Sequence, residues 1–189
     1  MMSTDIMIVG VGGQGTLLAS RLLGQVLTAQ GFDVKVSEVH GMSQRGGSVV
    51  TYVKYGQEVT SPIIQEGEAD YILAFELLEA ARWLPFLKPS GKLIINTQKL
   101  NPMPVITGAE EYPADVLTAL RASGADVTAL DALTPALEAG SAKAVNVVLL
   151  GALAKRMEFP EEVWLNALEK TVPPRFLEMN QKAFALGRS

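Results

Sequence analysis

Two glycine-rich segments hold the residues whose types and spacing could do chemistry. The first, GVGGQGTLL, begins at Gly10, and the second, HGMSQRGGS, begins at His40. Gly10, Gly12 and Gly15 satisfy the pattern G-x-G-x-x-G between an apolar run and a helical pattern. Glycine lets a backbone approach a ligand closely, and the helix expected from about Thr16 would direct unpaired N–H groups toward that ligand. The segment therefore predicts a site for an anionic or polar ligand.

The side chains of the first segment leave two alternatives open. Gln14 could add an amide donor to the site, and Thr16 could add a hydroxyl. The glycines could instead form a tight turn that only allows close packing of strand and helix. An NAD site would further need an acidic residue at the end of the second strand, and Glu38 has that position. An NAD site therefore stays open on spacing alone.

The second segment gathers polar side chains around three further glycines. Arg45 precedes Gly46 and Gly47, so a guanidinium group would lie beside backbone amides, an arrangement suited to phosphate or carboxylate. His40 could donate a hydrogen bond or act as an acid or base. A loop histidine that caps a carbonyl, and an arginine in a surface ion pair, are the alternatives. The remaining candidate residues of this segment are Gly41, Ser43, Gln44 and Ser48.

Composition excludes several classes of function. A formal net charge of −4 over 189 residues predicts no broad basic surface, so we expect no nucleic-acid partner. The absence of cysteine excludes disulfides, cysteine nucleophiles and any iron–sulfur cluster held by this chain alone. A single histidine excludes a multi-histidine site, and we expect no metal here. No apolar run reaches bilayer length and no signal peptide is evident, so we expect a cytoplasmic chain without membrane contact.

The elements that must position these residues follow an α/β order. The apolar run Ile6–Val9 predicts a buried parallel strand. A helix over about 16–30 and a strand over 33–39 complete a βαβ unit, for which we expect a right-handed crossover. Further strands are expected at 48–55, 70–75, 92–96 and 126–130, helices at about 76–87 and 114–122, a turn at 89–91 and a surface loop at 101–104.

The C-terminal third changes to helical patterns. Helices are expected at 142–157, 161–170 and 174–187, and the first is apolar enough for a buried element or a subunit interface. We expect a Rossmann-like open, mostly parallel sheet flanked by helices, with a helical C-terminal region. The chain is interpreted as one domain over 1–189, with an α/β core of about 5–157 and C-terminal helices over about 160–187.

Polar residues also follow two of the expected strands. Glu76 and Glu79 come after the strand 70–75, where a catalytic carboxylate is conceivable, although acidic residues favoured by a helix dipole are the commoner explanation. Asn96, Thr97 and Gln98 end the next strand and could line the same crevice. The carboxyl ends of the strands are thus expected to carry the site.

Together the two glycine segments carry a family resemblance. GVGGQG followed by HGMSQRGGSV resembles the gamma-type subunit or domain of the 2-oxoacid:ferredoxin oxidoreductases, which act on pyruvate, ketoisovalerate or indolepyruvate. The second segment is more similar to the indolepyruvate type than to the pyruvate or 2-oxoglutarate types. The resemblance spans about residues 5–156. It implies the fold expected above.

The resemblance also implies a division of labour between subunits. Such enzymes decarboxylate a 2-oxoacid oxidatively on thiamine diphosphate, take up coenzyme A and pass electrons through iron–sulfur clusters to ferredoxin. A larger alpha subunit would supply the thiamine diphosphate and cluster sites, and this chain would complete the active-site region and help receive coenzyme A. The first loop would comprise Gly12, Gly13, Gln14, Gly15 and Thr16, and the second His40, Gly41, Ser43, Gln44, Arg45, Gly46 and Gly47.

Two other functions remain compatible with the residues. A self-contained NAD(P)-dependent oxidoreductase would bind NADH, which its fluorescence on titration would report. A non-catalytic nucleotide-binding assembly module would bind a ligand at the same turns and transform nothing. The isolated chain could also form a homodimer, and aryl pyruvates as substrates follow from the resemblance alone.

The anion role assigned to Arg45 gives a first prediction. Arg45→Ala should weaken coenzyme A use in the complex assembled with the larger subunit far more than it lowers the stability of the fold, because the substitution removes a charged fork from a loop. Steady-state kinetics with varied coenzyme A would measure the first effect and thermal unfolding the second. An unchanged dependence on coenzyme A would refute the anion role.

Overall fold

The fold is built on a single six-stranded sheet. The computed structural model describes residues 3–41 and 46–189. The order of the strands is β2-β3-β1-β4-β5-β6, and β3 is antiparallel to both of its neighbours while the other neighbouring pairs are parallel. The expected mostly parallel α/β fold is confirmed. The strands are β1 (Thr4–Val11), β2 (Asp33–His40), β3 (Ser48–Gly56), β4 (Ala69–Ala74), β5 (Leu87–Asn96) and β6 (Asp126–Leu130).

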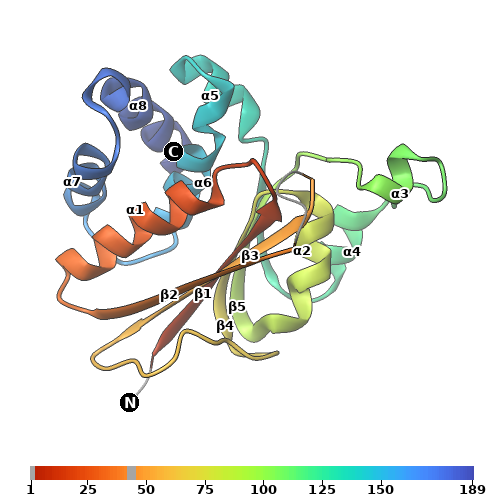
Figure 1. Ribbon diagram of the computed structural model, residues 1–189, viewed down its shortest axis with the longest axis horizontal. Helices are drawn as coiled ribbons and strands as arrows, with labels where there is room; N and C mark the ends of the chain where they lie inside the picture. The colour runs from red at the N-terminus through yellow and green to blue at the C-terminus, as the bar shows by residue number, and fades with distance from the viewer. Residues whose placement is uncertain (1–2, 42–45) are drawn as a thin grey trace.

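The first three strands differ from a simple βαβ unit. Helix α1 (Thr16–Ala29) links β1 to β2, and these two strands run in the same direction because each is antiparallel to β3. The strand β3 lies between them in the sheet. The chain therefore runs back from β2 along β3, and the end of β2 and the start of β3 both lie at the carboxyl end of β1 (Figure 1). This inserted strand is what brings the two glycine segments together.

Helices cover both faces of the sheet. Alternate residues of β1 point to opposite sides, with Ile6 and Ile8 in one apolar cluster and Met7 and Val9 in the other. The first cluster packs against α1 and the helices α6 (Val145–Ala154), α7 (Glu161–Thr171) and α8 (Leu177–Arg188). The second packs against α2 (Leu77–Trp83) and α4 (Val116–Ala122). Figure 1 shows the same three layers.

One expectation about local structure was wrong, one held only in part, and one helix was not expected. The turn at 89–91 does not form, because β5 runs through it with a shift in register opposite Ala69 and Tyr71. Gly91 permits that shift, since a Cβ there would lie 2.9 Å from the Ala69 carbonyl oxygen. The loop 101–104 partly forms the helical turn α3 (Met103–Ile106). Helix α5 (Leu133–Ala139) was missed, and its Pro135 lies in the first turn, where a helix needs no N–H donor.

Helices α6 and α8 approach each other unusually closely. Their contact is made at Gly151 of α6 and Gly187 of α8. A Cβ on Gly151 would lie 2.2 Å from the Phe184 carbonyl oxygen, and one on Gly187 would lie 1.9 Å from that of Val148. Helix α6 is buried along almost its whole length, as its composition predicts. Within the two described ranges, no helix has the length and apolar character needed to cross a membrane.

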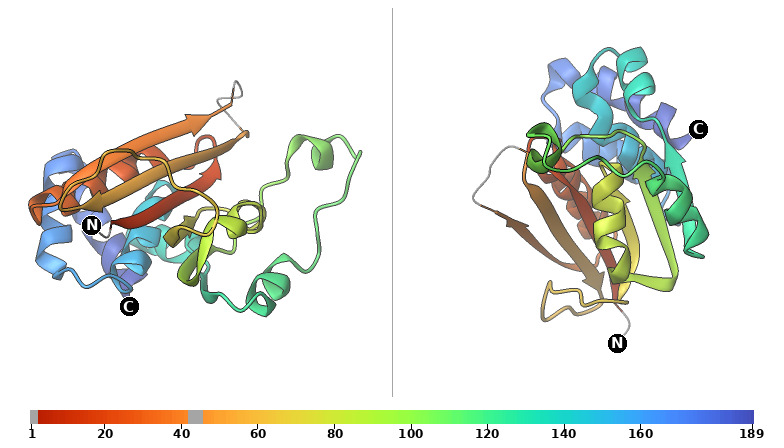
Figure 2. Two further views of the ribbon diagram at one scale, coloured as in Figure 1. Left: turned by 90° about the horizontal axis from the view of Figure 1, so that it is seen from below. Right: turned by 90° about the vertical axis from the view of Figure 1, so that its right-hand side faces the viewer.

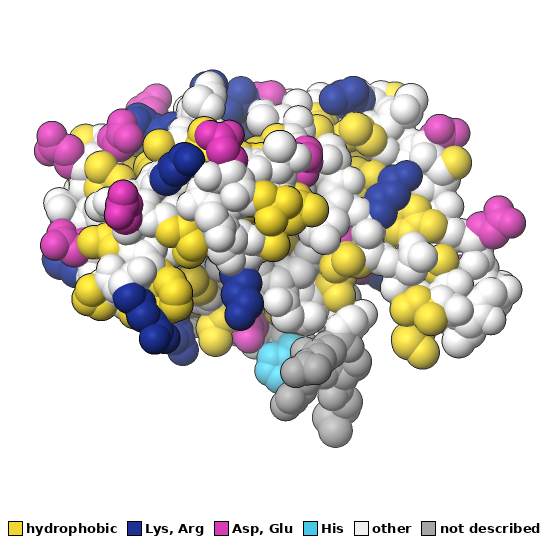
Figure 3. Space-filling model, turned by 90° about the horizontal axis from the view of Figure 1, so that it is seen from above, with side chains coloured by type: hydrophobic (Ala, Val, Ile, Leu, Met, Phe, Trp, Pro, Cys, Tyr) yellow, Lys and Arg dark blue, Asp and Glu magenta, His cyan; other side chains and the backbone are white. Residues whose placement is uncertain are grey.

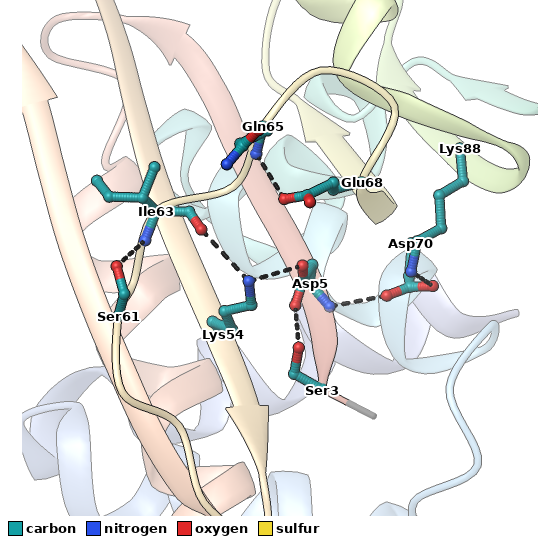
Figure 4. Close-up of polar contacts among 9 residues, drawn as sticks. All are labelled: Ser3, Asp5, Lys54, Ser61, Ile63, Gln65, Glu68, Asp70 and Lys88. Carbon is teal, nitrogen blue, oxygen red and sulfur yellow. Dashed lines mark hydrogen bonds and ion pairs between the residues drawn. The ribbon is translucent and has the colours of Figure 1, made fainter. Parts of the chain in front are cut away.

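The amino edge of the sheet is held by a network of polar contacts (Figure 4). The buried Asp5 carboxylate accepts a hydrogen bond from Ser3 and lies 3.1 Å from the Lys54 ammonium. The Asp5 N–H donates to Asp70, which pairs with Lys88 at 2.6 Å. These contacts tie β1, β3 and β4 together at the edge opposite the glycine segments.

The connection from β5 to α4 projects from the body of the molecule. Figure 2 shows this segment, which includes α3, as an excursion that extends away from the sheet and its helices. Met103 and Ile106 of α3 are both 64% exposed. The two ends of the excursion return to the body beside α2, where the side chain of Glu76, the residue that precedes this helix, contacts both of them.

The close contact of α6 and α8 makes a sharp prediction. Gly151→Ala should lower the free energy of unfolding by about 3 kcal/mol, because the added methyl group has no space against the backbone of α8. Gly24→Ala in α1 is the matched control. Nothing lies within 4 Å of a Cβ there, so it should raise stability by up to about 1 kcal/mol through helix propensity. Urea unfolding measures both, and equal effects would contradict the packing described.

Candidate functional site

The two glycine segments meet at the carboxyl edge of the sheet. The Gly12 N–H donates to the Gly47 carbonyl oxygen at 2.9 Å, and the Gly46 N–H donates to the Gly12 carbonyl oxygen at 3.5 Å. The pairing of β1 with β3 aligns Val11 with Ser48, so both loops leave the sheet at the same point. The sequence predicted two segments at one edge, and the structure shows that they hydrogen-bond to each other.

The first turn needs its glycines for backbone reasons. Gly13 and Gly15 have φ values of +100° and +85°, which side chains with a Cβ rarely adopt. A Cβ on Gly10 would lie 2.9 Å from Cβ of Phe75, and one on Gly15 would lie 2.7 Å from the Asn146 side-chain nitrogen. That nitrogen donates to the Gly15 carbonyl oxygen at 3.3 Å. Close packing and positive φ therefore both operate in this turn.

Gln14 holds the turn together through its own side chain. Its Oε1 accepts a hydrogen bond from the Val11 N–H at 2.7 Å, and its Nε2 donates to the Phe75 carbonyl oxygen at 3.0 Å. The amide donor that the sequence suggested for a ligand is thus bound to backbone in this structure. Contact between Gln14 and a ligand stays a prediction.

Asn96 donates a second hydrogen bond to the Phe75 carbonyl oxygen. Its Nδ2 donates to the Phe75 oxygen at 3.1 Å, and its Oδ1 accepts from the Ala132 N–H at 3.2 Å. Asn96 is 0% exposed, so it does not line the crevice surface as the sequence suggested. It connects the ends of β4 and β5 to the beginning of α5.

A hollow of about 410 Å³ lies between the first glycine turn, the start of α1 and the end of β2. It is open toward the N-terminal turn of α1, whose first N–H groups have no carbonyl partner within a helix. Glu38 and His40 of β2 also line it, and the Glu38 carboxylate accepts a hydrogen bond from the Thr51 hydroxyl at 3.4 Å. Its lining residues are Gly12, Gly13, Gly15, Thr16, Leu17, Glu38, His40 and Val49.

His40 lies at the exposed end of β2. Figure 3 shows the one histidine of the chain, in cyan, at the surface. Its Nδ1 is 3.2 Å from the Gly41 carbonyl oxygen, a contact of the kind that the capping alternative describes. The contact involves Nδ1 and not Nε2, so an acid–base role for His40 stays a prediction.

Part of the second segment lies outside the described residues. Ser43, Gln44 and Arg45 fall in the range 42–45, so their predicted roles stay predictions. Gly46 has a φ of +76°, and Gly47 carries the carbonyl that meets Gly12. Of the predicted residues, the structure thus brings together the first turn, His40 and the glycine pair.

A second hollow lies on the other side of the first turn. It has a volume of about 450 Å³ and is bounded by Gly13, Gln98, Leu133 and Lys143, among others. Lys143 supplies a cation near the N-terminal end of α6, while the first hollow contains Glu38 and His40.

Two buried glutamates stand behind the glycine segments. Glu76 is 1% exposed and Glu79 is 5% exposed. The Glu76 carboxylate accepts hydrogen bonds from the Glu79 N–H at 2.9 Å and from the Tyr112 hydroxyl at 2.6 Å. It also accepts one from the Leu100 N–H at 3.1 Å. Glu76 thus caps α2, as a residue at the helix start should, and it also holds the projecting excursion at both of its ends.

The Glu79 carboxylate reaches a different segment. It accepts a short hydrogen bond from the Ser48 hydroxyl and one from the Trp83 indole N–H at 3.3 Å, and Arg82 pairs with it at 3.1 Å. The sequence could not indicate the partner Ser48, because 31 residues separate the two. Burial, and next the bond to Glu76, raise the pKa of the Tyr112 hydroxyl, so that hydroxyl remains a donor.

No metal centre accompanies these groups in the described part of the chain. Among residues 3–41 and 46–189, no cluster of three or more histidine, cysteine, aspartate or glutamate side chains is arranged to hold a metal ion. Glu76 and Glu79 satisfy their oxygens with protein donors instead.

Known sequences resemble this chain over nearly its full length. The pyruvate ferredoxin/flavodoxin oxidoreductase family matches residues 5–189. An indolepyruvate oxidoreductase subunit IorB from Thermococcus kodakarensis is 42% identical, over 99% of this chain and 95% of the relative. The common gamma subunit of the pyruvate/ketoisovalerate oxidoreductases from Pyrococcus abyssi is 27% identical, over 95% of this chain and 92% of the relative.

Solved structures share the fold. The pyruvate oxidoreductase subunit PORC of Thermotoga maritima superposes with a TM-score of 0.74 at 19% identity, covering 100% of this chain and 96% of that one. A 2-oxoglutarate:ferredoxin oxidoreductase from Magnetococcus marinus, solved with 2-oxoglutarate, coenzyme A and succinyl-CoA bound, gives a TM-score of 0.74 at 18% identity. This chain covers 31% of that protein. The full-length family match and the 42% identity show that the chain belongs to the pyruvate ferredoxin/flavodoxin oxidoreductase family, as a gamma-type subunit of a 2-oxoacid:ferredoxin oxidoreductase.

Proposed function

We propose that this chain supplies the coenzyme A-binding part of an indolepyruvate-type 2-oxoacid:ferredoxin oxidoreductase. A larger partner subunit holds thiamine diphosphate and the iron–sulfur clusters, and electrons leave the complex to ferredoxin. The chain would act as a non-autonomous subunit that completes the active-site region. Its similarity to indolepyruvate oxidoreductase subunits along 99% of its length supports the substrate class.

The observation that carries the coenzyme A role is the hollow between the first glycine turn, the start of α1 and the end of β2. Backbone N–H groups and the start of α1 form one wall, which suits the phosphate groups of coenzyme A. Glu38, which also lines the hollow, can accept hydrogen bonds from hydroxyl or amine groups, which the same ligand carries. The related fold of the Magnetococcus marinus enzyme, which was solved with coenzyme A bound, supports the assignment.

Reconstitution tests the division of labour directly. The chain alone should give no turnover, and adding the larger subunit should restore ferredoxin reduction that depends on both a 2-oxoacid and coenzyme A. Robust turnover by the chain alone would contradict the proposal.

Titration with NADH tests the alternative that the chain is an NAD(P)-dependent oxidoreductase. A site for coenzyme A should leave NADH fluorescence unchanged at millimolar concentration of the dinucleotide.

Two substitutions of opposite charge at Leu17 test whether the hollow receives the phosphate groups of coenzyme A. This side chain is 46% exposed, lines the hollow and belongs to the first turn of α1. Leu17→Glu should raise the KM for coenzyme A about tenfold by repulsion of the phosphates, whereas Leu17→Lys should leave it unchanged or lower it. An acidic residue in a first helical turn favours the helix, so a loss of folding does not explain a loss of binding.

Ile63→Glu is the matched control for that experiment. Ile63 is 52% exposed and lies at the opposite edge of the sheet (Figure 4), so the same charge there should leave the KM for coenzyme A as it is. Steady-state kinetics of the assembled complex with varied coenzyme A make the measurement. Equal values for Leu17→Glu and Leu17→Lys would show that the hollow does not receive the anionic part of the ligand.

A further inference from the structure

The Glu79 carboxylate does not cap its own helix, because another residue already does so. It lies in the first turn of α2, where a glutamate commonly bonds back to the start of its own helix. In this chain Glu76 already caps α2 by accepting from the Glu79 N–H. The Glu79 carboxylate turns instead toward β3, where it accepts from the Ser48 hydroxyl. Two of its donors, Arg82 and the Trp83 indole, belong to α2 itself, and Ser48 is the partner that it contacts in another element.

Ser48 connects that carboxylate to the hollow on the opposite face of the sheet. Residues of a strand alternate between faces, so Ser48 points to the α2 side while Val49 points to the α1 side. Val49 lines the hollow and is paired with Gly10 on one side and His40 on the other. Gly47, on the other side of Ser48, accepts the hydrogen bond from Gly12. Ser48 therefore lies between the residue that accepts the hydrogen bond from the first glycine turn and the residue that lines the hollow.

We propose that Glu79 is a positioning residue that fixes the start of β3, through Ser48, against the first glycine turn. The hydrogen bond between the two holds Gly47 at Gly12 and Val49 in the wall of the hollow. The residue acts from behind the sheet and does not touch the ligand. This inference rests on the proposed function, because it assigns the effect of Glu79 to the coenzyme A site.

Because Glu79 has other partners, the effect of its contact with Ser48 on the site can be measured separately from its effect on the stability of the fold. Without the Ser48 hydroxyl, the carboxylate still accepts from the Trp83 indole at 3.3 Å and pairs with Arg82 at 3.1 Å. The Arg82 side chain is 53% exposed, so its charge can also follow a small movement of Glu79. Loss of the hydroxyl therefore leaves no buried charge without a partner, and α2 keeps its cap from Glu76.

The test compares Ser48→Ala with Ser48→Thr in the complex assembled with the larger subunit. Ser48→Ala should raise the KM for coenzyme A about fivefold, the effect of roughly 1 kcal/mol lost from a charge-assisted hydrogen bond. The kcat and the KM for the 2-oxoacid should change less than twofold. Ser48→Thr keeps the hydroxyl and should restore the wild-type value. Ser37→Ala, which removes a serine hydroxyl from the neighbouring strand β2, is the matched control and should behave as wild type.

The outcomes separate this inference from the proposed function. If Leu17→Glu raises the KM for coenzyme A and Ser48→Ala does not, the positioning role is overturned while the coenzyme A site stands. If Ser48→Ala lowers the melting temperature and kcat together and Ser48→Thr fails to rescue either, the contact is only structural and the inference is wrong. If neither Leu17→Glu nor Ser48→Ala changes the KM, the coenzyme A assignment is wrong and the inference is overturned with it.

Discussion

The site depends on one carbonyl oxygen, that of Phe75 at the end of β4. It accepts hydrogen bonds from Gln14 at 3.0 Å and from Asn96 at 3.1 Å, while the Phe75 N–H donates to Val9 at 2.8 Å. The first glycine turn, β1 and β5 are thus fixed to a single residue at the end of β4. Since the donors are side-chain amides in a largely buried setting, each bond also satisfies a group that would be costly to leave unpaired.

The residues that follow Phe75 extend this frame to the rest of the carboxyl edge. Glu76 fixes both ends of the excursion between β5 and α4, through Leu100 and Tyr112. Glu79 reaches Ser48 at the start of β3. A seven-residue helix could not be stable on its own in water, so its position comes from these tertiary contacts and from the apolar cluster beneath it. The short segment from Phe75 to Glu79 thereby contacts Gln14 of the first glycine segment and Ser48 of the second.

Much of the fold follows from the sequence because its signals are local. The glycine turn, α1 and the strand 126–130 were predicted at or close to their observed positions, since apolar periodicity and caps specify them. The position of β3 between β1 and β2 was not predicted, because strand order is decided by pairing between distant residues. The turn expected at 89–91 failed for a related reason: Gly91 accommodates a close neighbouring strand instead of a reversal.

The site shows the same division between local and distant information. The glycines and His40 were identified from their spacing, yet the hydrogen bonds of Gln14, Asn96 and Glu79 join residues 61, 21 and 31 positions apart. Asn96 was expected at the crevice surface and is instead buried beneath it. Single-residue chemistry therefore suggested candidate groups, while the partner that each group contacts came only from the fold.

The central claim is that this chain brings the coenzyme A site to the complex. Calorimetric titration of coenzyme A into the larger subunit alone, and into the complex of both subunits, tests it most directly. We predict that binding is detected with the complex and is absent, or at least tenfold weaker, with the larger subunit alone, a difference of about 1.4 kcal/mol. Equal affinity in the two titrations would contradict the claim, because the larger subunit would then hold the whole site.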